Sequence, residues 1–156
     1  MEQRSLPGHA VSSKGSAGGS ADLTGLNKEL VAYRMSRADE TLEDARILAN
    51  AERWNACVNR LYYACFYAIS ALLLRDGLSS TRHSGIRGLF NREYVKPGKI
   101  PRNLARIFND LFERRQEGDY VDFVSFKGPQ VTPWISQADE LIRHIACLVQ
   151  SSQSSK

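Results

Sequence analysis

Apolar residues recur along most of this chain at the three- and four-residue spacing of helices that bury one face. The pattern predicts helices over about 26–50, 53–75, 82–95, 101–116 and 132–150. No segment sustains the alternation that is typical of a β-strand. The sequence therefore predicts an all-α fold class, an antiparallel up-and-down helical bundle of about five helices.

Short turn signals separate the predicted helices. Gly77 is placed to end the second helix, and the hydroxyl residues at 79–81 are candidate N-caps for the third. The segment 96–99 predicts a turn, after which the fourth helix opens at a proline. Thr132 is the predicted N-cap of the fifth helix, with Pro133 at its first position.

Composition divides the chain into three parts. Residues 1–22 form a leader rich in Ser and Gly, with too few large apolar residues to fold, so we expect it to be disordered. The bundle occupies 24–150 as a single domain. Residues 151–156 form a tail that we expect to fray.

The segment 59–74 is apolar on almost every side, so its helix must be enclosed by others. We expect it to be the central helix, packed between the first, fourth and fifth. Asn59 and Arg60 stand near its start. Burying an amide and a guanidinium without partners costs several kcal/mol, roughly. These side chains therefore lie either at the rim of the core or in a polar site inside it.

The positive charge is unevenly distributed. The whole chain carries a net charge of +4, whereas the window 82–115 holds nine Lys and Arg against three acids, a net charge of +6. Such an excess is the electrostatic footprint of a protein that binds a polyanion. The alternative is a solvated face of two helices.

The cysteines and histidines indicate no metal site and no cofactor. Cys57, Cys65 and Cys147 form no CxxC pair and lie in apolar helical patterns, so we expect buried free thiols in a reducing compartment. The three histidines are scattered. We find no apolar run of about 18 residues, the length that crosses a bilayer. We therefore expect a cytoplasmic protein with no membrane contact.

Spacing predicts a candidate ligand site where two helices meet. Asn59 and Tyr63 share a helix face, and Arg60 neighbours Tyr63. An antiparallel or tilted packing brings the end of the fourth helix near this face, with its polar and aromatic residues Arg114, Arg115, Asp119 and Tyr120. Guanidinium groups bind phosphate with forked hydrogen bonds, and Asn and Tyr can orient a ribose or phosphate oxygen. The alternative is a structural Arg–Asp pair at the helix end, with Tyr120 packed as a lid.

The order and spacing of four motifs resemble the HEPN (higher eukaryotes and prokaryotes nucleotide-binding) domain family, in its small stand-alone prokaryotic branch. The motifs are Asn59-Arg60-x-Tyr62-Tyr63-x-x-Phe66, His83-Ser84-Gly85, Gly98-Lys99-Ile100-Pro101 and Arg115-Gln116-x-x-Asp119-Tyr120-x-x-Phe123. The resemblance covers about 28–150. It implies a helical bundle that dimerises and a nucleotidyltransferase protein as partner, in a two-gene toxin–antitoxin system.

The resemblance also implies a nuclease alternative. Active relatives cut RNA without metal, using an Arg and a His that follows shortly after it. Here Arg114 or Arg115 can supply the arginine, but residues 116–122 contain no His. In a nuclease, Arg115 and Asp119 would be the catalytic pair, although an Asp is a weak base unless burial raises its pKa. His83 could fold back toward the pocket, but we expect it to make a hydrogen bond at a helix N-terminus instead.

Three functions therefore stay open. The first is a nucleotide- or RNA-binding module, the second a non-catalytic protein-interaction module, and the third a metal-independent RNase toxin. Tyr62, Tyr67 and Phe90 are expected to be exposed aromatics, which favours a homodimer with two-fold symmetry.

Overall fold

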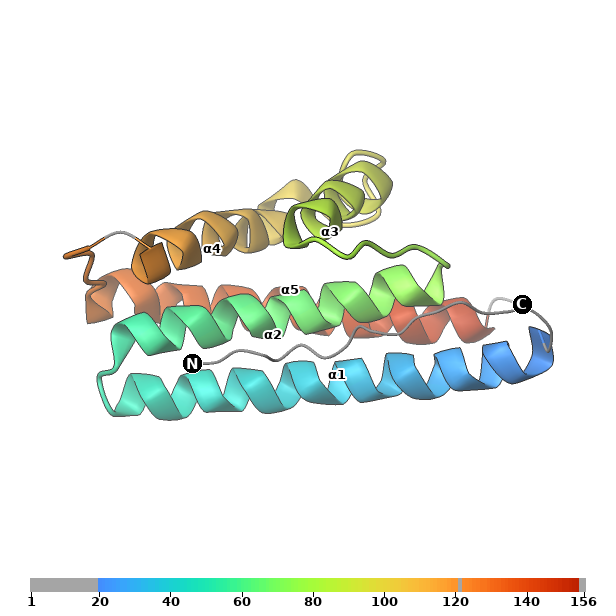
Figure 1. Cartoon of the computed structure of the whole chain (residues 1–156), viewed down its shortest axis with the longest axis horizontal. Coiled ribbons are helices and arrows are strands. Elements are labelled where there is room, and N and C mark those ends of the chain that lie inside the picture. Colours follow the sequence, from blue (N-terminus) through green and yellow to red (C-terminus); the bar gives the residue numbers. More distant parts are fainter. Residues whose placement is uncertain (1–19, 121, 155–156) are drawn as a thin grey trace.

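The computed structural model describes residues 20–120 and 122–154. Within these residues the elements are all helical: α1 (Ser20–Asn50), α2 (Trp54–Arg75), α3 (His83–Phe90), the π-helix η2 (Asn91–Val95), α4 (Arg102–Tyr120) and α5 (Gly128–Ser154). Helices α1, α2 and α5 run along the length of the molecule, and α4 lies with α3 and η2 on the other side of α2 from α1 (Figure 1). The predicted all-α bundle is confirmed.

Helix α2 is the core of the fold. It packs against α1, α5, α4 and α3, and its residues from Leu61 to Leu73 include many that are fully buried. The predicted central position is therefore confirmed. Our expectation about membrane length needs correction, because α2 is long and apolar enough to cross a bilayer by length and composition alone. Enclosure by neighbouring helices accounts for that composition, since 67% of its most apolar window is buried.

Gly77 ends α2 as predicted. It adopts a positive φ of 75°, and its N–H donates to the carbonyl of Leu74 at 3.0 Å. The next N–H, of Leu78, reaches back to the carbonyl of Leu73 at 2.8 Å. This is a Schellman motif, in which glycine adopts the left-handed conformation without a Cβ penalty.

The predicted start of α5 is wrong. The carbonyl of Lys127 accepts the first helical hydrogen bonds, and the Gln130 side chain accepts one from the Lys127 N–H at 3.2 Å. This reciprocal cap, with a first-turn proline at 129, starts the helix before Thr132. Thr132 instead donates its hydroxyl to the carbonyl of Gly128 at 2.8 Å, and Pro133 lies inside the helix.

The predicted third helix has the right extent but the wrong cap and an unforeseen end. Its N-cap is Arg82, with no capping side chain, while the Ser80 hydroxyl accepts the Arg82 N–H at 3.2 Å. From Asn91 onward the helix widens into η2, in which the Lys96 N–H reaches the Asn91 carbonyl at 2.8 Å. A π-helix of this kind is rare and occurs frequently at functional sites.

The outer boundaries also differ from the prediction. Helix α1 begins at Ser20, inside the predicted leader, and α5 continues to Ser154, inside the predicted tail. Residues 1–19 of the leader and 155–156 of the tail lie outside the described part of the chain. Helix α4 runs to Tyr120 and so exceeds its predicted end at 116.

The cysteines are as predicted at two of three positions. Cys57 and Cys65 are buried free thiols. Cys147 is exposed, so the prediction that it is buried was wrong. Burial raises the pKa of Cys57 to about 11 and that of Cys65 to about 12. Neither thiol therefore forms a reactive thiolate near neutral pH.

A polar clamp holds the end of α2 against η2 and α5. Asp76 accepts hydrogen bonds from Arg75, at 2.9 and 3.0 Å, and from the hydroxyl of Tyr94. Arg75 also donates to the Leu148 carbonyl of α5. Burial alone would raise the pKa of Asp76, but the hydrogen bonds from Arg75 and Tyr94 and nearby positive charges lower it below its ordinary value of 3.8.

We predict that Asp76→Asn lowers the free energy of unfolding by about 1.5–3 kcal/mol at pH 7, because charge-assisted hydrogen bonds are lost. A depressed native pKa stabilises the fold above the ordinary pKa and ceases to do so as pH falls through the native value. The difference between variant and wild type should therefore be constant from pH 7 to about 4 and shrink below that. Urea unfolding across this range measures it.

Asp110→Asn is the matched control, because Asp110 pairs with Arg106 at 3.8 Å on an exposed face. We expect this change to cost less than about 1 kcal/mol. An equal loss of unfolding free energy in the two variants would contradict the stabilising role of the clamp.

Candidate functional site

Tyr62 of α2 contacts residues of both α3 and α4. Its side chain is fully buried, and its ring stacks on Phe108 of α4, with centroids 5.6 Å apart and planes 13° apart. Its hydroxyl lies 3.1 Å from Nδ1 of His83, the first residue of α3. Burial raises the pKa of Tyr62 far above its ordinary value, so the phenol stays protonated.

Arg115 brings a positive charge onto the same ring. Only 8% of this residue is exposed, and its guanidinium carbon lies 4.7 Å from the ring centroid of Tyr62 and 5.7 Å from that of Tyr63. Cations over the faces of aromatic rings at such distances are stabilised by the ring quadrupole. Arg115 also continues the apolar stripe of α4 formed by Phe108 and Phe112, which is why it faces α2.

A second guanidinium approaches Tyr63 from α2 itself. Arg60 lies 5.3 Å from the Tyr63 centroid, and its Nε and Nη2 donate to the side-chain oxygen Oδ1 of Asn59 at 3.2 and 3.0 Å. Asn59 and Arg60 also line a hollow of about 320 Å³ with Leu48, Asn55 and Ala56. The ring of Tyr63 therefore lies near two guanidinium groups, one from α2 and one from α4.

His83 takes the less favoured of its two expected positions. Its ring centroid lies 4.5 Å from that of Phe66 and 5.9 Å from that of Tyr62. It therefore folds back onto α2, and the predicted hydrogen bond at a helix N-terminus is wrong. Burial first, and the charge of Arg115 second, lower its pKa below 6.5. The imidazole is thus neutral at pH 7 and able to take a proton.

Arg60, Tyr62, Tyr63, His83 and Arg115 form what we call the arginine–tyrosine cluster. Tyr62 and Arg115 are its buried base, whereas Arg60, Tyr63 and His83 are partly exposed. The cluster combines two guanidinium groups with aromatic rings and a neutral imidazole. These groups suit a ligand with phosphate oxygens and a stackable base.

The remaining predicted residues are not part of this cluster. Arg114 points elsewhere, since its Nη1 pairs with Glu117 at 3.1 Å on an exposed face. Asp119 and Tyr120 lie in the last turn of α4, and their side chains are outside the described part of the structure. Their predicted roles as ligand-binding residues, and that of Asp119 as a catalytic group, therefore stay predictions. Within the described residues, no group of His, Cys, Asp and Glu could hold a metal ion.

Comparison with known proteins places this arrangement in a family. The family model for the HEPN domain matches residues 31–148. A UPF0332 protein of Thermotoga maritima is 43% identical over 123 residues, which cover 79% of this chain and 93% of that protein. The "Putative toxin MJ0142" of Methanocaldococcus jannaschii is 31% identical over 93 residues, 60% of this chain and 63% of that protein. In the same organism, "Putative toxin MJ0605" is 32% identical over 99 residues, 62% of this chain and 74% of that protein. The match over most of the bundle shows that this chain belongs to the HEPN domain family.

Proposed function

We propose that this chain is a toxin-like HEPN protein that binds RNA or a nucleotide at the arginine–tyrosine cluster. The observation that carries the proposal is the pair of guanidinium groups, from Arg60 and Arg115, around the ring of Tyr63. One ring can stack on a base while the two cations receive the adjoining phosphate. The names of the two Methanocaldococcus relatives support the toxin part of the proposal.

A second candidate function is metal-independent RNA cleavage, which His83 favours. Such cleavage needs a base for the ribose 2′-hydroxyl and an acid for the leaving oxygen. The residues after Arg115 offer no His, but the fold supplies one from α3, on the same aromatic ring as Arg115. When Nδ1–H donates to the Tyr62 hydroxyl, Nε2 carries the free lone pair of a base.

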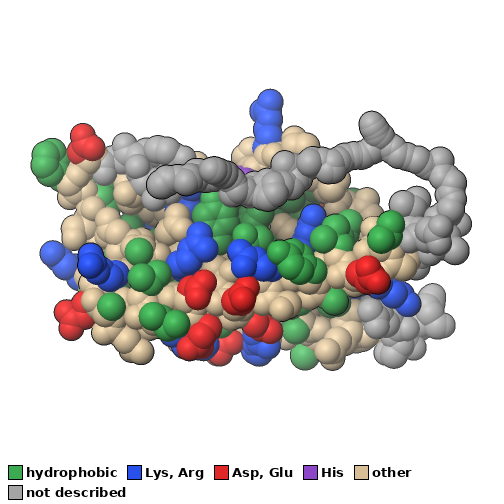
Figure 2. Space-filling model, turned by 60° about the horizontal axis from the view of Figure 1, so that its bottom comes forward, with side chains coloured by type: hydrophobic (Ala, Val, Ile, Leu, Met, Phe, Trp, Pro, Cys, Tyr) green, Lys and Arg blue, Asp and Glu red, His purple; other side chains and the backbone are tan. Residues whose placement is uncertain are grey.

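The proposed partners follow from the family and from the surface. A nucleotidyltransferase protein, as the other half of a toxin–antitoxin pair, is implied by the resemblance to HEPN proteins. The expected surplus of exposed aromatics was wrong, because Tyr62 and Phe90 are fully buried and Tyr67 is half-buried under Arg37. Other apolar residues are exposed on α1, among them Leu26 at 60% and Tyr33 at 60%. Hydrophobic side chains lie among acidic and basic ones on the face that Figure 2 shows.

The first prediction about function concerns binding. Arg115→Ala should weaken the binding of a short single-stranded RNA about 10- to 100-fold, because a charge-assisted contact with phosphate is lost. Arg60→Gln, at a partly exposed position that the core does not need, should weaken it in the same direction. Fluorescence anisotropy measures both, with circular dichroism as the check on folding.

Arg114→Ala is the matched control, since it removes the neighbouring guanidinium, which pairs with Glu117. It should leave the affinity within about threefold of wild type. Equal losses for Arg114 and Arg115, or unchanged binding in Arg60→Gln and Arg115→Ala, would remove the proposed site.

The second prediction separates binding from cleavage. If the protein cleaves RNA, His83→Ala should abolish the cleavage in EDTA while retaining most of the binding. The rate should rise with pH and level off at a pKa below 6.5, because the base acts in its neutral form and burial lowers its pKa. Gel assays from pH 5 to 8 measure this.

His144→Ala is the control, because His144 contacts the Lys99 carbonyl of a distant loop. RNA that stays intact with wild-type protein across this range would rule out the second candidate and leave the binding proposal standing.

The third prediction concerns assembly. A homodimer that uses the exposed apolar face of α1 should be disrupted by Tyr33→Lys, because burying an ammonium in an apolar interface is costly. Light scattering with size-exclusion chromatography should give a dimeric mass for wild type and a monomeric mass for the variant. A wild-type protein that is monomeric at micromolar concentration would contradict the proposal.

A further inference from the structure

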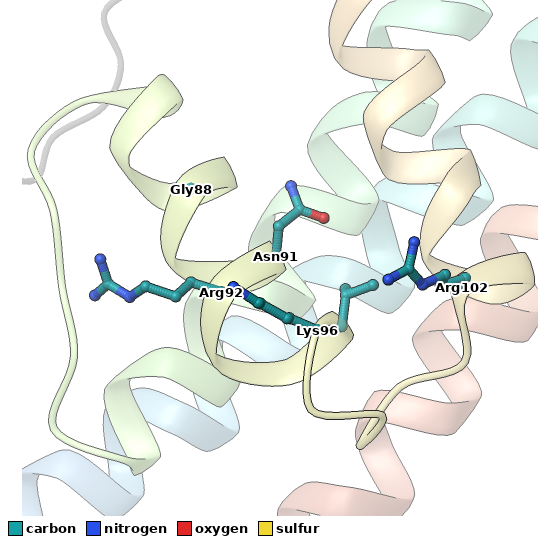
Figure 3. Close-up of a pocket in the computed structure, with 6 residues that line it drawn as sticks. Gly88, Asn91, Arg92, Lys96 and Arg102 are labelled. Carbon is teal, nitrogen blue, oxygen red and sulfur yellow. The ribbon is translucent and has the colours of Figure 1, made fainter.

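A second concave surface lies at the junction of η2 and α4, away from the arginine–tyrosine cluster. It has a volume of about 440 Å³, and its lining is rich in cations: Gly88, Asn91, Arg92, Val95, Lys96 and Arg102. We call it the basic hollow (Figure 3). It belongs to the window that carries the excess positive charge of the sequence.

The cations of the basic hollow are poorly neutralised. Among the described residues, neither Lys96 nor Arg102 has an acidic group within 4.0 Å. Arg92 pairs at 3.0 Å only with the adjacent Glu93, and 66% of its side chain is exposed. Figure 3 shows Arg102 reaching from the start of α4 toward η2, while Arg92 extends along the other side of η2. Like charges around a concave surface raise the local concentration of anions.

The wall of the basic hollow is fixed by hydrogen bonds. The Asn91 amide donates to Asn109 Oδ1 at 3.0 Å and accepts from Asn109 Nδ2 at 3.2 Å. It also donates to the Arg87 carbonyl at 2.9 Å. These hydrogen bonds hold η2 against α4. The site is therefore preformed, with Arg92 and Lys96 on one side of it and Arg102 on the other. Preformed geometry reduces the ordering cost of binding.

We propose that the basic hollow binds phosphate groups of an RNA backbone, as a second contact beyond the proposed cluster. Guanidinium and ammonium groups are the donors that phosphate takes. The only apolar side chain in the lining is that of Val95, so the surface lacks the large anchor typical of a protein interface. Along α3, Gly88 of this hollow lies about 8 Å beyond His83 at 1.5 Å per residue, so one RNA strand can contact both sites.

The experiment compares two triple variants in anisotropy titrations across salt concentrations. The test variant is Arg92→Gln with Lys96→Gln and Arg102→Gln. The control variant removes the same charge at exposed positions elsewhere, Lys28→Gln with Arg53→Gln and Lys127→Gln. The probes are a 12-nucleotide single-stranded RNA, ATP and polyglutamate. Circular dichroism and melting temperature verify folding.

For RNA, the test variant should bind at least about tenfold more weakly at low salt. The slope of log K against log salt should fall by about 2, because each phosphate contact on a single strand contributes about 0.7. The control variant should keep the wild-type slope. The proposal would be overturned if the slope did not change in the test variant, or if it changed equally in the control variant. It would also be overturned if the test variant lost affinity for ATP alone, or lost as much affinity for polyglutamate as for RNA.

The outcome also separates this site from the cluster. If Arg115→Ala weakens binding and the test variant does not, only the basic hollow is refuted. If the test variant alone weakens binding, the basic hollow stands and the proposed function of the cluster fails.

Discussion

The structure depends on one burial: the guanidinium of Arg115 lies over the rings of Tyr62 and Tyr63 where α4 crosses α2. Removing a cation from water costs several kcal/mol, roughly. A cation–π interaction at a desolvated site offsets about 2 kcal/mol of that cost. Both rings contribute to that stabilisation, and the contact fixes where α4 lies on α2. The same ring of Tyr62 receives His83, so α2, α3 and α4 meet at one point.

Much of this arrangement could be predicted from the sequence. The four-residue spacing of Asn59 and Tyr63 placed them on one helix face, and the uninterrupted apolar run placed α2 in the centre. The choice between Arg114 and Arg115 could also have been made, because Arg115 continues the stripe of Phe108 and Phe112 and Arg114 does not. The stripe itself therefore favours Arg115 over Arg114 as the residue that faces α2.

Three other features could not be predicted from the spacing of residues along the chain. His83 reaches Tyr62 only because of the path taken by the connection from Gly77, and no periodicity encodes that path. The start of α5 was misjudged because two cap signals compete, and the pair of Lys127 and Gln130 prevails over Thr132. The widening of α3 into η2 begins at Asn91, whose side chain exchanges hydrogen bonds with Asn109 of α4. Tertiary contacts place His83 and Asn91, whereas the start of α5 is decided by a local cap.

The most direct test of the central claim is an NMR titration of the protein with a short single-stranded RNA, following aromatic and imidazole side-chain resonances. If a ligand binds at the arginine–tyrosine cluster, the signals of Tyr63, Phe66 and His83 shift together, while those of Trp54 and Trp134 stay constant. Shifts at the two tryptophans with no change at Tyr63 and His83 would contradict the account.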